Sequence, residues 1–389
     1  MADASTGVSD VDQDGRPAGR VWVLDDPRAG GAEAAIGIAE RLGTPFRRIP
    51  LSWNWLAHVA ALSPHGSLLG LAAVGRGSGS AGRIGQGWEQ AIGYAAPGRR
   101  NPPPVAGSAA PSWQEGNPAE AAWSRLCPAS PALAHVSRPV LTLSSGSRSA
   151  AVALWLKARL GTRLVHCARP GLRGSAFDLL VVPRHEQPPD AANVLATLGL
   201  THRLSPLLLR QARLAWQERL SHLPHPRIAL LVGGPVRGTD LKPAVAHTLG
   251  TRIAGLAKSL NGSVLATTSR RTGAEATDAL AAGLAPSLHV LYRWGEPGPN
   301  PYEAFLASAD AIVVTGDSIA MLSEACATDA AVFVALPELA GAQQRRLHAS
   351  LFEAGQARLL GGSVSPWPRT PLDEAGRVAA EIIRRFPLE

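Results

Sequence analysis

The second half of the chain alternates short apolar runs with longer stretches in which apolar residues recur every three or four positions. The short runs are typical of strands buried on both faces, and the longer stretches are typical of helices that cover them. Strands separated by helical connections predict a parallel sheet with helices on both faces. The expected strands are residues 227–232, 263–267, 288–292, 311–315 and 331–335, and the expected helices are residues 243–260, 274–282, 301–308, 318–327 and 342–354.

The first half shows the same alternation with one long interruption. Residues 64–138 are rich in Gly, Pro, Ser and Ala and have weak periodicity, so we expect long loops there with one or two short helices. The polar residues 1–19 lack an apolar pattern and are expected to form a disordered tail. The expected strands are residues 20–24, 46–51, 140–144, 163–167 and 178–182, and the expected helices are residues 32–43, 149–160 and 206–220.

A proline-punctuated segment that ends at Pro226 separates the two halves. Placing the domain boundary there gives an N-terminal domain of residues 20–225, with the irregular region inside it, and a C-terminal domain of residues 226–389. The last helix is expected to pack back on the N-terminal domain. The sequence thus predicts an α/β fold of two doubly wound domains that face each other across a cleft.

The formal net charge of +8 raises the question of a nucleic-acid partner. The basic residues are almost all Arg and are scattered, without the clustered stripe and interleaved aromatic residues that nucleic-acid binding predicts. We therefore expect no nucleic-acid partner. No run approaches the roughly 18 apolar residues of a membrane helix, and the N-terminal segment lacks the apolar core of a signal peptide. These features favour the cytoplasm.

The three cysteines, Cys127, Cys167 and Cys326, are far apart and lack C-x-x-C spacing. They predict neither a disulfide framework nor a metal site, and we expect them to be small buried apolar residues. No metal and no cofactor are expected.

The loop at residues 268–272 (TSRRT) directly follows a predicted strand, at the end of the sheet where such folds bind ligands. Arg270 and Arg271 offer planar donor forks that suit phosphate or carboxylate groups, with the Ser269 hydroxyl beside them. The alternative is that Ser269 or Thr272 caps the following helix. Of these residues we expect Arg270→Ala to weaken nucleotide binding most.

The loop at residues 315–318 (TGDS) lies at the end of another predicted strand and opens a helix. Thr315, Asp317 and Ser318 surround a tight turn, and the first N–H groups of the helix favour an anion. Glu324, farther along the same helix, is a carboxylate suited to ribose hydroxyl groups. The alternative is that Asp317 and Ser318 only cap the helix.

Four other strand ends or helix starts carry candidate residues. Glycines after strands permit close approach of a ligand, Asn before Pro opens a helix, and His185 is a candidate acid–base group. For each group a turn, a cap or a structural histidine is the alternative. The residues are Gly30, Gly31, Gly233, Gly234, Asn300, Tyr302 and His185.

Four segments resemble the bacterial branch of the mitochondrial-fission elongated-mitochondria protein family, whose bacterial members are commonly described as candidate glycosyltransferases. The segments are TTSRRT, NPYEAFLASADAIVVTGDSIAMLSEACAT, FDLLVVPRHE and VWVLDDPRAGGAEAAIGIAERLG. The resemblance implies two Rossmann-like domains in the GT-B arrangement of glycosyltransferases, with the C-terminal domain binding the sugar nucleotide. It implies a donor site of Ser269, Arg270, Arg271, Asp317, Ser318 and Glu324, faced from the N-terminal domain by Gly146, Ser147, Arg148, Arg184 and His185.

Two departures from the family pattern concern the chemistry. Ala34 stands where members usually have a polar residue, and no His follows the first glycine pair, so the usual position of a catalytic base is empty. Glu33, Asp25 and His185 are the substitutes, of which we take Glu33 and His185 as the catalytic candidates. The Gly-x-Pro usual after the Glu324 helix is also replaced here, by residues 329–331.

The leading hypothesis is a glycosyltransferase that moves a sugar from a nucleoside-diphosphate-sugar to a cell-envelope acceptor. The acceptor would be a lipid-linked sugar or a lipopolysaccharide, reached at the inner face of the cytoplasmic membrane. A nucleotide-sugar 2-epimerase-like enzyme is one alternative, and a non-catalytic scaffold that keeps the nucleotide-binding fold is another.

Overall fold

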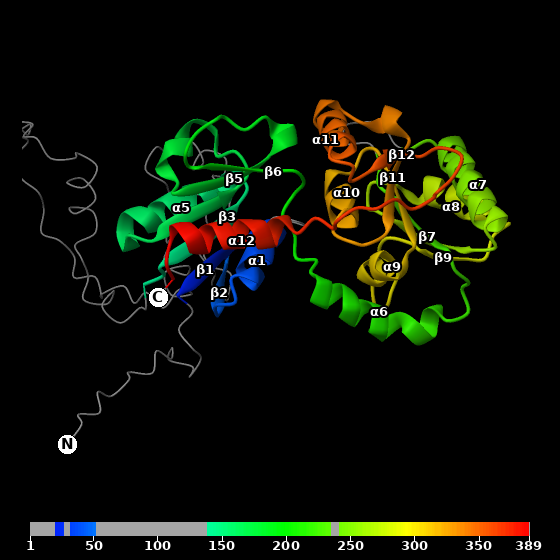
Figure 1. The fold of residues 1–389 in the computed structure, drawn as a ribbon, viewed down its shortest axis with the longest axis horizontal. Coiled ribbons are helices and arrows are strands. Elements are labelled where there is room, and N and C mark those ends of the chain that lie inside the picture. Colours follow the sequence, from blue (N-terminus) through cyan, green and yellow to red (C-terminus); the bar gives the residue numbers. More distant parts are fainter. Residues whose placement is uncertain (1–19, 27–31, 52–137, 235–240, 389) are drawn as a thin grey trace, which may run out of the picture. The chain divides into compact units, whose positions relative to one another are not determined.

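The computed structural model describes residues 20–26, 32–51, 138–234 and 241–388 (Figure 1). By internal contacts the chain divides into two compact units, Met1–Leu180 with Ile382–Glu389, and Val181–Glu381. The described residues form two six-stranded sheets whose described strand pairs are all parallel. The expected tail and the glycine-rich interruption lie outside the described residues.

The first sheet has the strand order β2-β1-β3-β4-β5-β6. The chain adds β2 on one side of β1 and then β3 on the other side, so the direction of winding reverses at β1. Helices α1 (Glu33–Arg41) and α5 (Ser147–Leu160) follow β1 and β3 along the chain. The strands are β1 (Val21–Asp25), β2 (Phe46–Pro50), β3 (Leu141–Ser145), β4 (Arg163–Cys167), β5 (Leu179–Pro183) and β6 (Val194–Thr197).

The second sheet has the order β12-β11-β10-β7-β8-β9. Counted along the chain from β7, this is the order 6-5-4-1-2-3, that of the Rossmann fold, whose topological switch point lies between the first and fourth strands. Those strands are β7 and β10, which pair with Ala311 opposite Ile228. The strands are β7 (Arg227–Val232), β8 (Ser263–Thr268), β9 (His289–Tyr292), β10 (Ala311–Thr315), β11 (Ala331–Ala335) and β12 (Arg358–Leu359).

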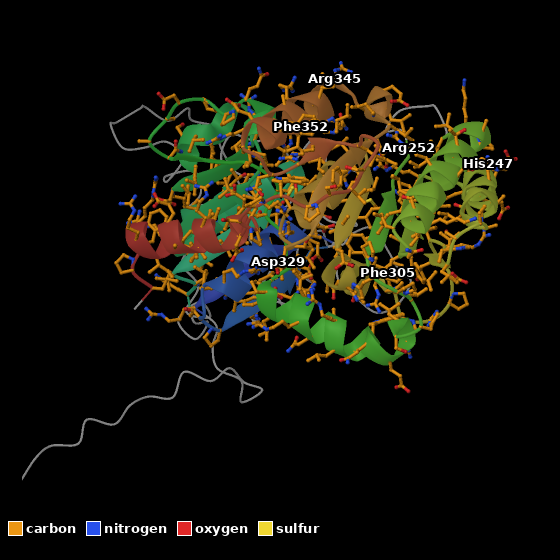
Figure 2. All side chains as sticks on the ribbon, turned by 45° about the vertical axis from the view of Figure 1, so that its right-hand side comes forward. His247, Arg252, Phe305, Asp329, Arg345 and Phe352 are labelled. Atoms are coloured by element: carbon orange, nitrogen blue, oxygen red, sulfur yellow. The ribbon has the colours of Figure 1, made fainter. Side chains whose placement is uncertain are left out.

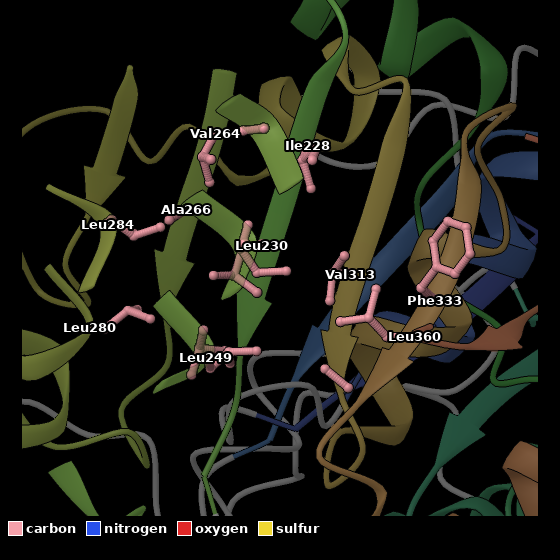
Figure 3. Close-up of a cluster of buried hydrophobic side chains, with 14 of the residues drawn as sticks. Ile228, Leu230, Leu249, Val264, Ala266, Leu280, Leu284, Val313, Phe333 and Leu360 are labelled. Atoms are coloured by element: carbon pink, nitrogen blue, oxygen red, sulfur yellow. The ribbon is translucent and has the colours of Figure 1, made fainter. Parts of the chain in front are cut away.

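Helices cover both faces of this second sheet. Alternate residues of β7 enter two different apolar clusters: Leu230 lies in the one drawn in Figure 3, and Leu231 lies in the other. The prediction of a doubly wound parallel sheet is therefore confirmed for the C-terminal half. The helices are α6 (Pro206–Leu220), α7 (Pro243–Ser259), α8 (Ala274–Leu284), α9 (Tyr302–Ser308), α10 (Ile319–Ala325) and α11 (Ala342–Glu353). The last helix, α12 (Glu374–Arg385), is separate from them, because its buried residue Val378 lies in neither of these clusters.

Helix α6 packs on α9, and Leu220 at its end is buried beside Phe305 in the second cluster (Figures 1 and 2). The domain boundary expected near Pro226 places this helix in the first domain, whereas its apolar side contacts the core of the second sheet. The contact-based division falls earlier still, at Leu180. The end of α12 belongs to the first unit, where the Arg163 guanidinium lies 5.8 Å from the ring of Phe386.

Among the residues described, no helix has both the length and the apolar composition needed to cross a bilayer. Cys167 and Cys326 are buried, as expected for small apolar residues, while Cys127 lies outside the described residues.

Candidate functional site

The carboxyl ends of β7 and β10 are joined by two hydrogen bonds at the switch point. The Gly233 N–H donates to Thr315 Oγ1 at 2.8 Å, and the Gly234 N–H donates to Asp317 Oδ2, also at 2.8 Å. A Cβ atom on Gly233 would lie 2.2 Å from Asp317 Oδ2, and one on Gly234 would lie 2.2 Å from the Arg271 carbonyl oxygen. Both positions require glycine because other loops approach the backbone so closely.

The hydroxyl groups of the loop at 268–272 hold the loop in shape. Thr272 Oγ1 donates to the Gly233 carbonyl at 2.6 Å and accepts the Ser269 N–H at 3.0 Å. Ser269 Oγ in turn accepts the Arg271 N–H at 3.2 Å. These bonds fasten the loop to the end of β7. The hydroxyl groups of Ser269 and Thr272 thus bond to the protein backbone in this structure.

The two arginines of this loop have different surroundings. Arg271 Nη2 lies 3.3 Å from Asp317 Oδ2, and the Asp317 side chain is fully buried while that of Arg271 is 36% exposed. Arg270 is exposed, and its guanidinium has no partner among the residues described. The buried carboxylate thus fixes Arg271 at the surface of the switch point and leaves Arg270 unrestrained.

Helix α10 follows the same turn. Ser318 is its N-cap, with Oγ accepting the Met321 N–H at 3.4 Å. Glu324, half-buried on this helix, accepts a short hydrogen bond from the hydroxyl of Tyr302 on α9. Burial, followed by the Glu324 carboxylate, raises the pKa of Tyr302 well above its ordinary value, so the hydroxyl stays protonated. Asn300 Oδ1 accepts the Tyr302 N–H at 3.0 Å, but the N-cap of α9 is Pro301, so Asn300 lies one residue before the cap position expected for it.

Two residues of α11 that the sequence did not single out also contact the turn. Gln344 Nε2 donates to the Asp317 carbonyl at 3.4 Å. His348, one helical turn later, lies under Gly316, where a Cβ atom would come within 3.1 Å of its Cε1. Burial lowers the pKa of His348, although a hydrogen bond to the Gly316 backbone and the Asp317 carboxylate oppose this shift. Their i, i+4 spacing was the available signal, but helical periodicity alone explains it.

The candidate residues of the first sheet lie at the end of β3 and on α1. Gly146 precedes α5 with φ of 84°, a backbone conformation that favours glycine, followed by the exposed Ser147 and the half-buried Arg148. Asp25 pairs with Arg48 at 2.7 Å. The remaining candidates here are Glu33, exposed in the first turn of α1, and Gly30 and Gly31, which lie outside the described residues.

His185 follows β5 but is almost entirely buried, with 1% of its surface exposed. Burial, with a smaller effect of the Arg346 charge, lowers its pKa to about 4, so the ring is neutral at pH 7. Arg346 Nε also donates to the His185 carbonyl at 2.7 Å. Arg184 beside it is exposed. A ring this buried reaches a substrate hydroxyl only if the residues around it move.

Within Val181–Glu381 the structure therefore brings together Gly233, Gly234, Arg271, Thr315 and Asp317. Helix α10 follows this turn. It is capped by Ser318 and carries Glu324, which accepts the hydrogen bond of Tyr302 on α9. Among the residues described, no three His, Cys, Asp or Glu side chains gather in a way that could hold a metal ion.

The topology and this site define a Rossmann-type α/β protein with polar loops at its switch point. The chain belongs to the Mitochondrial fission ELM1 family, whose family model matches residues 29–386. It is 27% identical over 280 residues to the Mitochondrial fission protein ELM1 of Arabidopsis thaliana, covering 64% of each chain, so it spans less than two thirds of that relative. The name of the family specifies no reaction.

Two solved structures are similar over most of the chain. The UDP-GlcNAc 2-epimerase of Methanocaldococcus jannaschii has a TM-score of 0.46 at 13% identity, covering 95% of this chain and 94% of its own. MurG of Acinetobacter baumannii has a TM-score of 0.42 at 12% identity, covering 95% of this chain and 92% of its own.

Proposed function

We propose that the chain binds a nucleoside-diphosphate-sugar at the carboxyl ends of β7 and β10 and transfers the sugar to a cell-envelope acceptor. The observation that carries the proposal is the pair of Arg271 and Asp317 at the switch point. The guanidinium forms an ion pair with the buried carboxylate at 3.3 Å and has no other partner among the residues described. A partly exposed cation fixed in this way is suited to a diphosphate.

The neighbouring helix supplies a carboxylate for the nucleoside. Glu324 is anchored by Tyr302 on one side and is half-exposed. A carboxylate held in one orientation can accept hydrogen bonds from both hydroxyl groups of a ribose. Arg271 and Glu324 thus supply the two contacts that a nucleoside diphosphate needs, one for each end.

In a transfer reaction the acceptor hydroxyl attacks the anomeric carbon as the bond to the diphosphate breaks. Arg271 would stabilise the negative charge that develops on the leaving diphosphate. A base must take the proton of the acceptor hydroxyl. Of the two candidates, Glu33 is exposed and His185 is buried, so the Glu33 carboxylate is the more accessible base. We place the reaction in the cytoplasm, with a lipid-linked or lipopolysaccharide acceptor at the membrane surface.

The burial of His185 also favours a second candidate function, a non-catalytic scaffold that keeps a nucleotide site. The two functions differ in turnover and agree in nucleotide binding. Transfer of a labelled sugar to extracted lipid would exclude the scaffold, and release of an epimerised sugar without an acceptor would identify an epimerase instead.

The test is calorimetric titration of the wild-type chain with UDP, GDP, CMP, dTDP and ADP. We expect one nucleotide to bind, and Arg271→Ala to weaken it about 10- to 100-fold, since a hydrogen bond to a charged group contributes about 1.5–3 kcal/mol. Glu324→Ala should also weaken it. Arg270→Ala is the matched control. Because Asp317 pairs with Arg271 and not with Arg270, we propose the reverse of the rank expected from the sequence.

Failure of the wild-type chain to bind any of the five nucleotides would refute the donor site. Binding that both arginine variants weaken equally would leave the site in place but remove the special role of Arg271.

A further inference from the structure

A cavity of about 480 Å³ lies at the opposite edge of the second sheet, where β7 and β10 begin. Its walls are the end of α7, the residues that precede the two strands, and residues 362–366. Because the strands are parallel, this edge is separated from the switch point by the length of the sheet. All lining residues belong to Val181–Glu381.

The segment that forms one wall of the cavity is fastened at both ends. The Leu360 N–H donates to the Val334 carbonyl at 2.9 Å, and Arg252 on α7 (labelled in Figure 2) donates to the carbonyls of Leu360 and Gly361 at 2.9 and 2.8 Å. At the other end the Trp367 indole N–H donates to the Gly355 carbonyl at 2.8 Å. The cavity is thus formed by fixed backbone, as small-molecule sites usually are.

Most of the wall is apolar. Pro226, Leu256, Val364 and Pro366 line it, and Leu260 at the end of α7 leaves 43% of its surface exposed. The volume lies within the range of about 300–1,000 Å³ that is common for ligand sites. The body of a fitting ligand is therefore a compact apolar or aromatic group.

The ionisable side chains of the wall are Asp310 and His225, which contact each other, and no Lys or Arg of the described residues lines the cavity. Asp310 Oδ2 accepts the Arg227 N–H at 2.6 Å and lies 2.6 Å from His225 Nδ1, whereas Oδ1 has no partner among the residues described. The carbonyl end of α7, at Ser259, adds partial negative charge. A ligand group that donates N–H bonds or carries a positive charge fits the Asp310 Oδ1 atom.

We infer that this cavity is a second binding site, for a small molecule with an apolar or aromatic body and one ammonium or amidinium group. The cation would contact Asp310 Oδ1 and the body would lie against Leu256 and Val364. The site selects the charge opposite to that selected at the switch point, so a nucleotide is not its ligand. It does not depend on the proposed transfer reaction.

The test uses three probes of similar size, benzamidine, benzyl alcohol and benzoate, in ligand-observed NMR titrations of the full chain. We expect benzamidine to bind most tightly and benzoate least. Asp310→Asn keeps the acceptor of the Arg227 N–H but removes the charge, and should weaken benzamidine about tenfold. Asp190→Asn, another exposed carboxylate of the same unit, is the control.

Gly362→Leu provides a second variant that leaves the charges in place. Gly362 lines the cavity, and a Cβ atom there meets no atom within 4 Å, so the position accepts a larger side chain without strain. The substitution should abolish benzamidine binding while the melting temperature stays that of the wild-type chain. Benzamidine that binds no better than benzoate, or that binds both variants as it binds the wild type, would overturn the inference.

Discussion

The guanidinium of Arg369 closes the end of helix α10. Its Nε and Nη2 donate to the Ala330 carbonyl at 3.0 and 2.6 Å, and its Nη1 donates to the Cys326 carbonyl at 3.0 Å. Nη2 also bonds the Thr328 carbonyl, and Nη1 the Gln356 side chain at 3.1 Å. The last carbonyls of a helix have no partner within it, and the Cys326 carbonyl here accepts both Arg369 and the Leu372 N–H at 2.9 Å. The Thr328 and Ala330 carbonyls, in the segment after the helix, accept from the same guanidinium.

Replacing Arg369 by Met keeps the apolar stem and removes every donor. A hydrogen bond to a charged group contributes about 1.5–3 kcal/mol, and the bonds of one guanidinium are not additive. Counting two of them independently, Arg369→Met should lower the free energy of unfolding of the second unit by about 3–6 kcal/mol. At about 2–4 °C per kcal/mol for a unit of this size, the melting temperature falls by about 6–24 °C.

Urea unfolding followed by tryptophan fluorescence and circular dichroism measures this change. Arg210→Met is the matched control, because Arg210 is exposed on α6 without a partner among the residues described. We expect the control to stay within about 0.5 kcal/mol of the wild type, as surface substitutions usually do. A loss below about 1 kcal/mol for Arg369→Met would refute the idea that these carbonyls depend on Arg369.

Two further predictions concern the sheets. Gly234→Ala should destabilise the second unit by about 2 kcal/mol in urea and abolish nucleotide binding, since its Cβ would lie 2.2 Å from the Arg271 carbonyl. Gly255→Ala, open on α7, should stabilise it, and like behaviour of the two would contradict the argument. Burial lowers the pKa of His166 from 6.5 to about 3, so below pH 6.5 the unfolded chain binds a proton that the folded chain refuses. Stability should therefore fall from pH 6.5 toward pH 3, with a shallower slope in His166→Asn, and equal slopes would exclude His166 as the cause.

The parallel strands were predictable to within a residue because buried strands are continuous apolar runs between turn residues. Strand β10 and strand β11 have the expected bounds, Ala311–Thr315 and Ala331–Ala335. Strands β6 and β12 were missed, because strands of four and two residues are too short to show a period. Ser318 was expected in the helix and instead caps it, which moves the start of α10 by one residue.

The candidate site was predictable as a set of loops and not as a set of contacts. The sequence shows two adjacent arginines as equivalent, and only the position of the Asp317 carboxylate separates Arg271 from Arg270. The contacts that Gln344 and His348 make with the turn could not be predicted for the same reason, because they depend on how α11 packs. Whether the candidate residues bind a ligand stays a prediction.

The packing of α6 decides how the second half of the protein can be isolated. Leu204, Leu220 and Leu223 belong to the same buried cluster as β7 and β10. A fragment that begins at Pro226 would lack all three leucines and would expose the apolar surface that they cover. Exposed apolar surface of this kind promotes aggregation. A fragment begun at Leu198 would keep them, together with the bond from the Leu200 N–H to Ser323. The choice of the first residue, more than any substitution, will decide whether this sheet can be purified alone for titration.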